Sequence, residues 1–217
     1  MKKIFFNEED EKRILEAIKE AENKTSGEIV LYIINRSDNY AEANFKSALL
    51  FGSIPIFVFM LLSLEWLLPV VITPFEIGII FICCCVLGFV LALFVPKVKR
   101  FFISQEEMLE QVMKRASVAF IDEDIVDTKS RNGILIYISF FERRAVVLAD
   151  KGINNKVPTD YWKDVVQIIS DNFKKGNKCE GIVQAIIKCS DILVEAGFAK
   201  GVDDENELRD DVKIKNE

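Results

Sequence analysis

The stretch Ile77–Val95, IGIIFICCCVLGFVLALFV, contains no charged residue and indicates what kind of protein this chain is. As a helix rising about 1.5 Å per residue it would span roughly 28 Å, close to the thickness of the hydrocarbon core of a bilayer. A second uncharged run, Ala48–Leu64, precedes it. Between the runs, Thr73-Pro74-Phe75-Glu76 places Thr at the N-cap, Pro at N1 and Glu at N3 of a new helix. We therefore predict a transmembrane helical hairpin over residues 48–95.

The charged residues beside the hairpin predict its orientation. The basic residues that flank the two runs are Lys46, Lys97, Lys99 and Arg100. The connecting segment contains Glu65 and Glu76 but no Lys or Arg. Because Lys and Arg next to membrane spans favour the cytoplasmic side, both ends of the hairpin are expected there. We therefore expect a protein of the cytoplasmic membrane, with both termini and the soluble domain in the cytoplasm.

The composition excludes several classes of function. The chain has 217 residues, a net charge of −6, five cysteines and no histidine. This length fits one domain in addition to the hairpin, and the negative charge argues against a nucleic-acid partner. The lack of histidine excludes Ser-His-Asp and Cys-His nucleophiles and imidazole-bound zinc. The cysteines show no metal-binding spacing, so we expect free thiols in a reducing compartment.

The soluble halves on either side of the hairpin read as one α/β domain. Strands are predicted at Glu28–Ile34, Gly133–Phe140 and Arg144–Ala149, with helices between Asn7 and Thr25, after Ser104, after Thr159 and over residues 180–196. A long crossover joins the first two strands, so they can be parallel, whereas the last two form an antiparallel hairpin with an exposed Glu142-Arg143 turn. The predicted fold is a three-layer α/β/α sandwich on a small mixed sheet, interrupted by a two-helix transmembrane hairpin. Its parts are residues 1–47, 48–95 and 96–197, followed by a disordered charged tail over 198–217.

Several short motifs carry a resemblance to a known family. They are Thr25-Ser26-Gly27-Glu28-Ile29-Val30, Arg115-Ala116, Ala119-Phe120, Thr128, Arg131-Asn132-Gly133-Ile134-Leu135-Ile136, Glu142-Arg143, Asp150-Lys151-Gly152-Ile153 and Trp162. In this order and spacing they resemble the TPM domain, and in particular its bacterial membrane branch, in which a transmembrane hairpin interrupts the domain. The resemblance covers about residues 7–197 and implies an α/β/α sandwich.

The resemblance also implies a range of roles. Members of the family are linked to photosystem repair, receptor modulation and divalent-cation binding, and a phosphatase role has been proposed for plant members. The positions that match here are landmarks of the fold, so no catalytic or cofactor-binding residue is carried over. The chain also has Asp150-Lys151-Gly152 where many soluble members carry Gly-Tyr-Gly.

The densest acidic cluster outside the tail is the segment Asp122–Asp127, DEDIVD. Ca²⁺ and Mg²⁺ take several oxygen ligands from flexible loops, so Asp122 and Asp124 are candidate ligands. The alternative is a solvated linker between a helix and the second strand. The segment also matches an Asp-x-Asp-x-Val motif with a phosphotransferase-type Asp nucleophile, but that motif should end a strand, whereas here it follows a helix.

Two further carboxylates lie near predicted strand ends. Asp150 follows the third strand, and Asp38 lies in the loop after the first. Because ligands of α/β proteins bind at strand ends, we expect Asp38, Asp122 and Asp150 to converge on one sheet edge and to bind Ca²⁺ or Mg²⁺. The alternative for Asp150 is a turn residue. Arg131 either holds an anionic ligand or pairs with Asp127 and closes the end of the sheet, and the second interpretation is preferred.

These observations predict a membrane-anchored TPM-type domain without enzymatic activity. It would bind a divalent cation, a protein partner or both at this edge, in the assembly or maintenance of a membrane complex. The alternative is a metal-assisted phosphohydrolase that uses the same acidic loops. A third class, a purely structural assembly factor, would show neither cation binding nor turnover.

Overall fold

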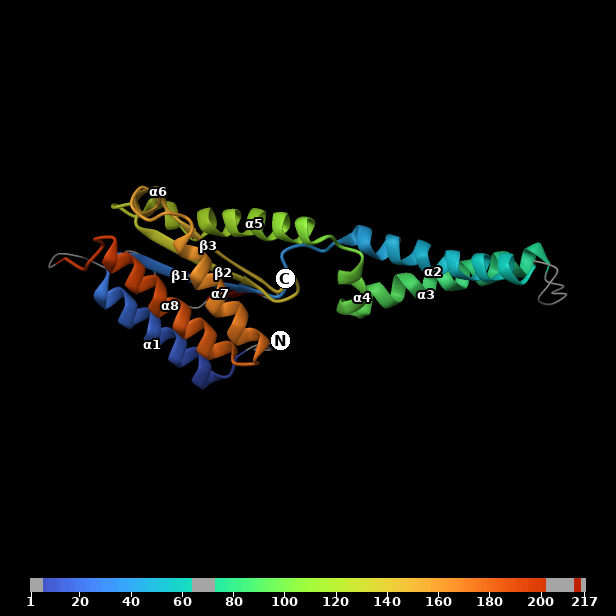
Figure 1. Ribbon diagram of the computed structural model, residues 1–217, viewed down its shortest axis with the longest axis horizontal. Helices are drawn as coiled ribbons and strands as arrows, with labels where there is room; N and C mark the ends of the chain where they lie inside the picture. The colour runs from blue at the N-terminus through green and yellow to red at the C-terminus, as the bar shows by residue number, and fades with distance from the viewer. Residues whose placement is uncertain (1–5, 64–72, 202–212, 216–217) are drawn as a thin grey trace. The chain divides into compact units, whose positions relative to one another are not determined.

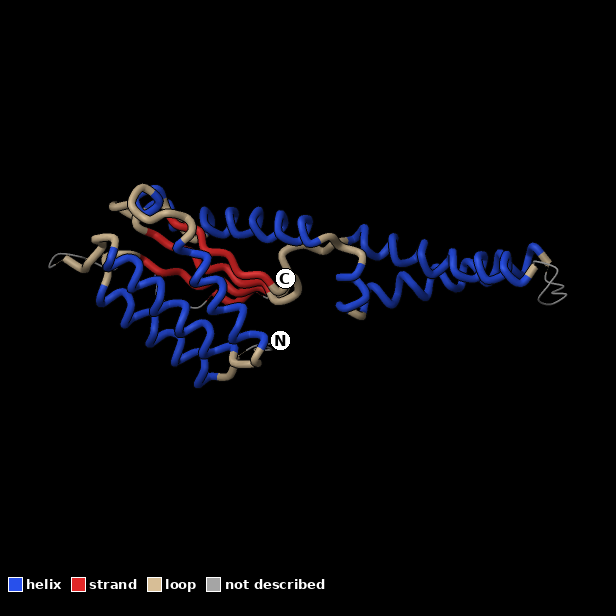
Figure 2. Tube along the Cα trace, in the orientation of Figure 1, coloured by secondary structure: helices blue, strands red, loops and turns tan. Residues whose placement is uncertain are grey.

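The computed structural model of the chain describes residues 6–63, 73–201 and 213–215 (Figures 1 and 2). The described residues form two compact units. One is Asp38–Met108, and the other combines the residues before Asp38 with those after Met108. The helices are α1 (Glu8–Lys24), α2 (Ala41–Leu62), α3 (Pro74–Phe94), α4 (Pro96–Phe101), α5 (Gln105–Asp122), the short 3₁₀ helix η1 (Ile125–Asp127), α6 (Lys151–Asn154), α7 (Tyr161–Lys174) and α8 (Lys178–Glu195). The strands are β1 (Glu28–Ile34), β2 (Gly133–Ser139), β3 (Arg144–Ala149) and β4 (Lys213–Lys215).

The sheet has the order β3-β2-β1-β4. β1 and β2 are parallel, from Glu28 opposite Gly133 to Ile34 opposite Ser139. β2 and β3 are antiparallel, with Ile134 opposite Ala149. The sequence predicted both of these pairings because the long crossover permits a parallel pair and the short turn requires an antiparallel one. The sheet is therefore mixed, as predicted.

The expectation that residues 198–217 are disordered is wrong for the parts that the structure describes. The carbonyl of Phe198 accepts a hydrogen bond from Ser26 N at 2.9 Å, and Lys200 N donates to Lys24 O at 3.2 Å. Further on, β4 pairs in parallel with the outer side of β1. These contacts supply hydrogen-bond partners for backbone groups at the end of α1 and on the edge of β1. Backbone pairing of this kind is open to a charged sequence as well as to an apolar one.

Helices cover both faces of the sheet (Figure 1). On one face the side chains of Ile29, Leu31 and Ile33 pack into a core with residues of α1, α7 and α8. On the other face Val30, Tyr32 and Ile34 pack against residues of α5. Because successive strand residues point to opposite faces, a strand that is apolar at nearly every position is buried on both sides. The predicted α/β/α sandwich is confirmed.

The second unit contains α2 and α3, which pack against each other. Ser47 Oγ donates a hydrogen bond to Gly88 O at 2.8 Å, and both residues are buried in the contact. The predicted cap of α3 is present, since Glu76 N donates to Thr73 Oγ1 at 3.4 Å and Thr73 N donates to the Glu76 carboxylate at 2.8 Å. Glu65 lies in the connection outside the described residues.

Most large apolar side chains of α2 and α3 point outward. Exposed residues on α2 include Leu49, Phe57 and Met60, and those on α3 include Ile82, Val86 and Phe94. Both helices are long and apolar enough to cross a membrane. The predicted helix pair is confirmed by this packing, and its outer surface has the chemistry of a lipid-facing surface.

Candidate functional site

The amino ends of β1 and β2 meet the carboxyl end of β3, where the buried carboxylate of Asp150 lies. Asp150 Oδ1 accepts a hydrogen bond from Lys151 N at 2.7 Å and so caps α6. Asp150 Oδ2 lies 3.5 Å from Arg131 Nη1 and accepts no hydrogen bond from the described residues. The carboxylate thus acts as a cap and as an ion-pair partner within the fold.

The loop before β2 fastens this end of the sheet. Asn132 N donates to Thr128 Oγ1 at 3.3 Å, and the Asn132 side-chain amide donates to Ser26 O beside β1. Arg131 has a left-handed backbone with φ of 52°, and its side chain donates to Val126 O. Its carbonyl accepts from Gly152 N at 3.0 Å. Arg131 closes the end of the sheet, as predicted, but its partner is Asp150 rather than Asp127.

The two predicted metal ligands of the acidic loop, Asp122 and Asp124, point to solvent. Asp122 is the last residue of α5, and Asp124 adopts a left-handed backbone with φ of 56° before η1. Both are exposed. Among the residues that the structure describes, no three Asp, Glu or Cys side chains form a group that could hold a metal ion. Metal binding by Asp38, Asp122, Asp124 and Asp150 stays a prediction.

The expected convergence of Asp38 with Asp122 and Asp150 is wrong. The loop that leads to Asp38 leaves β1 after Ile34, which is opposite Ser139, whereas Asp150 N bonds Gly133 O at the other end of β2. Seven strand residues separate these ends by roughly 20 Å. Because β3 runs antiparallel to β2, its carboxyl end lies beside the amino ends of the other two strands.

A buried polar cluster occupies the carboxyl end of β1 and β2. Ser37 N donates to Glu142 Oε1 at 2.9 Å, and Ser139 Oγ donates to Glu142 Oε2. The hydroxyls of Ser37 and Tyr137 are 3.1 Å apart. Burial of the phenol raises the pKa of Tyr137 to about 12. The prediction of an exposed Glu142 is wrong, because this carboxylate joins the loop after β1 to the turn after β2.

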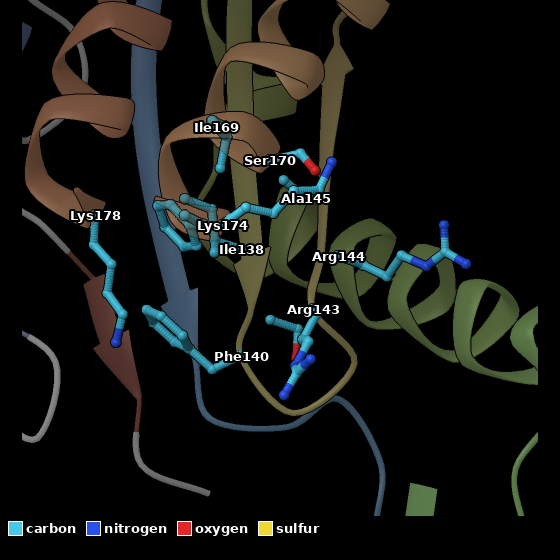
Figure 3. A pocket seen from close by; sticks show the side chains of 11 residues that line it. Ile138, Phe140, Arg143, Arg144, Ala145, Ile169, Ser170, Lys174 and Lys178 are labelled. Atoms are coloured by element: carbon cyan, nitrogen blue, oxygen red, sulfur yellow. The ribbon is translucent and has the colours of Figure 1, made fainter. Parts of the chain in front are cut away.

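Beside this cluster lies an open cavity of about 660 Å³, which the sequence did not indicate. Its walls come from the ends of β2, β3 and α7 and from the start of α8 (Figure 3). Apolar side chains, including Ile138, Ile169 and Phe173, line part of it. The charged lining residues are all basic: Arg143, Arg144, Lys174 and Lys178. The arrangement is suited to an anion with an apolar body.

Comparison with known proteins finds similarity in both sequence and fold. Residues 91–192, from the end of α3 through most of α8, match the sequence profile of the TPM domain. Among solved structures, the chain is similar to the NMR structure of the BA42 protein from the psychrophilic bacterium Bizionia argentinensis, with 25% identity and a TM-score of 0.61. That match covers 99% of this chain and 100% of that chain. None of the curated proteins matches the chain. The predicted resemblance to the TPM domain is thus confirmed by sequence over residues 91–192 and by fold over the chain.

Proposed function

We propose that the protein is a membrane-anchored TPM domain that binds a protein partner and does not catalyse a reaction. The observation that carries the proposal is the outward-facing apolar surface of α2 and α3. Leu49, Met60, Ile82 and Phe94 are each about half exposed or more. Exposed apolar surface of this extent on a helix pair is typical of lipid contact. The basic residues of α4 support an orientation with the soluble domain in the cytoplasm.

Extraction of membranes at alkaline pH tests the anchoring. We expect the full chain to stay in the membrane pellet, because two spans hold it by burial of apolar area rather than by charge. A variant with Ile82→Lys and Val86→Lys, on the lipid-facing side of α3, is expected to leave the pellet, since charges inside the bilayer are costly. Release of the unaltered chain would contradict the proposal.

An apolar stripe on α5 supports a protein partner. Leu109, Met113 and Ile121 follow one another at multiples of four residues and are 42%, 39% and 61% exposed. Such spacing places them on one side of the helix, where a partner can cover them. A photo-cross-linking residue at Met113 is expected to capture a protein in cells. The matched position Lys163, exposed on α7, is expected to capture none, and equal capture would contradict this surface.

The divalent cation is a second candidate, favoured by the buried Asp150 Oδ2 that accepts no hydrogen bond. A buried carboxylate oxygen of this kind is a suitable first ligand for Ca²⁺ or Mg²⁺, to which Asp122 and Asp124 would add further oxygens. Calorimetric titration of the full chain in neutral detergent tests it. Saturable binding that Asp150→Asn and Asp124→Asn remove would support a site, and no binding would leave the acidic loop as a linker. Turnover of a phosphoester, lost in the same variants, would instead support the metal-assisted phosphohydrolase.

A further inference from the structure

We propose that the outer edge of β1 binds the C-terminal strand of a second copy of this chain, which exchanges with the chain's own β4. The inference goes beyond membrane anchoring and the partner surface on α5, and it depends on neither. The structure shows which strand fits this edge, because Lys213–Lys215 pair in parallel with Tyr32–Ile34. A second copy carries the same segment, and the backbone of a strand edge can pair with it equally well from either chain.

The pairing of β4 with β1 is short. β1 has seven residues, and among the described residues three of them pair with β4. Nearer the start of β1, Ile29 N donates instead to Glu22 Oε1 of α1 at 3.3 Å. Few backbone bonds therefore hold β4, and their net contribution is opposed by the conformational entropy lost when its residues are ordered. Such a strand opens more readily than β2, which pairs with β1 along all seven residues.

One side-chain contact makes the edge selective for this strand. Lys213 Nζ lies 3.3 Å from Glu123 Oε2, and the two side chains are only 26% and 13% exposed. Water screens this pair less than an exposed one such as Lys163 with Asp160, whose side chains are 80% and 82% exposed. The strand of a second copy would bring the same Lys to Glu123, whereas a strand with an acidic residue at that position would be repelled.

The connection to β4 is long enough for exchange. The chain reaches Gly201 close to the end of α1, where Lys200 N donates to Lys24 O at 3.2 Å. Residues 202–212 then lead to Lys213 and can span up to roughly 40 Å when fully extended. The seven residues of β1 span only roughly 20 Å. The connection can therefore carry the strand to the edge of a neighbouring copy as well as to its own.

Two full-length chains with reversed charges, mixed in neutral detergent, test the inference. One carries Glu123→Lys and the other Lys213→Glu, each with a different N-terminal tag. Alone, each variant places like charges at positions 123 and 213, both within one chain and between identical copies. In the mixture, exchange brings opposite charges together at both edges. Co-purification of the two tags is expected to be about tenfold greater for the mixture than for two tagged forms of either variant alone.

A matched control separates pairing from net charge. Lys163→Glu makes the same change of charge as Lys213→Glu, but at an exposed position on α7. Mixed with Glu123→Lys, it is expected to co-purify no more than the single variants do.

A second variant shows whether β4 itself makes the contact. Ile34 O accepts from Phe140 N on the β2 side, so the carbonyl of Ile33 faces β4. The parallel register assigns the Lys215 N–H to that carbonyl. Lys215→Pro removes this donor and is expected to abolish the co-purification when it is added to both charge-reversed chains.

The result that supports strand exchange is co-purification that the mixture of Glu123→Lys and Lys213→Glu enhances and Lys215→Pro abolishes. Co-purification no greater in this mixture than in either variant alone would overturn it. Equal enhancement with Lys163→Glu would also overturn it, because association would then follow net charge. Co-purification that survives Lys215→Pro would overturn it as well, since the copies would then associate through another surface.

Discussion

Adding one methyl group at Gly88 is expected to separate α2 from α3. A Cβ atom there would lie 2.7 Å from Phe51 Cβ and 2.8 Å from Ser47 O, which is backbone and cannot move aside on its own. Small residues at such contacts let helices approach closely inside a membrane, where apolar burial does not hold them together. Gly78, on the same helix, has no atom within 4 Å of an added Cβ and provides the matched control.

The magnitude follows from two opposing effects. Replacing Gly by Ala within a helix stabilises it by about 0.5–1 kcal/mol. Overpacking a close contact costs about 1–3 kcal/mol. Gly78→Ala has only the first effect and is expected to raise the free energy of unfolding by up to about 1 kcal/mol. Gly88→Ala has both effects and is expected to lower it by up to about 2.5 kcal/mol.

Unfolding of the full chain by SDS in mixed micelles, followed by far-UV circular dichroism, measures the difference. Gly88→Ala is expected to lose helix at a lower SDS fraction than the unaltered chain, and Gly78→Ala at an equal or higher fraction. If the two variants unfold at the same SDS fraction, the close packing of α2 on α3 at Gly88 is refuted.

Three further predictions concern the α/β domain. In urea, Asp150→Ala is expected to lower the free energy of unfolding by about 1–3 kcal/mol, because it removes both the cap of α6 and the partner of Arg131. Asp150→Asn is expected to lower it by less, because the Asn side chain can still cap α6. Equal losses in the two variants would contradict the capping role. The pKa of Tyr137 is about 12 in the folded chain against 10.0 in the unfolded chain. The stability of the fold is therefore unaffected below pH 10 and falls between pH 10 and 12, where only the unfolded chain loses this proton. In thermal melts, Tyr137→Phe should lose less stability over this range than the unaltered chain. Burial raises the pKa of the Cys179 thiol to about 11 and also raises the pKa of the Cys189 thiol. At neutral pH a thiol reagent should therefore modify these two cysteines much more slowly in the native chain than in urea. Equal rates would refute their burial.

Continuous apolar runs and capping residues made much of the fold predictable. β1 and β2 are apolar at nearly every position because helices cover both faces of the sheet. The start of α3 followed from Thr73 and its capping partner. β4 was missed because its three residues, Lys213–Lys215, lie in a charged segment and are ordered by pairing with β1, which no local pattern reveals.

The candidate sites were harder to predict because their groups come from distant parts of the chain. Glu142 is buried by a hydrogen bond from Ser37, which lies 105 residues away. The cavity combines a turn with the ends of two helices, and its one local signal is the pair Arg143-Arg144 at the start of β3. Asp38 was wrongly expected to lie beside Asp150. Because β3 runs antiparallel to β2, its last residue lies at the opposite end of the sheet from the last residue of β1.

The central claim, that α2 and α3 anchor the α/β domain on the cytoplasmic side of a membrane, is tested most directly by thiol labelling in intact bacterial cells. A membrane-impermeant maleimide is applied to chains carrying Phe75→Cys at the start of α3 or Lys163→Cys on α7, both exposed positions, with the unaltered chain as background. We predict that Phe75→Cys is labelled in intact cells and Lys163→Cys only after the membrane is permeabilised. Labelling of Lys163→Cys in intact cells, or of neither position until permeabilisation, would contradict the account.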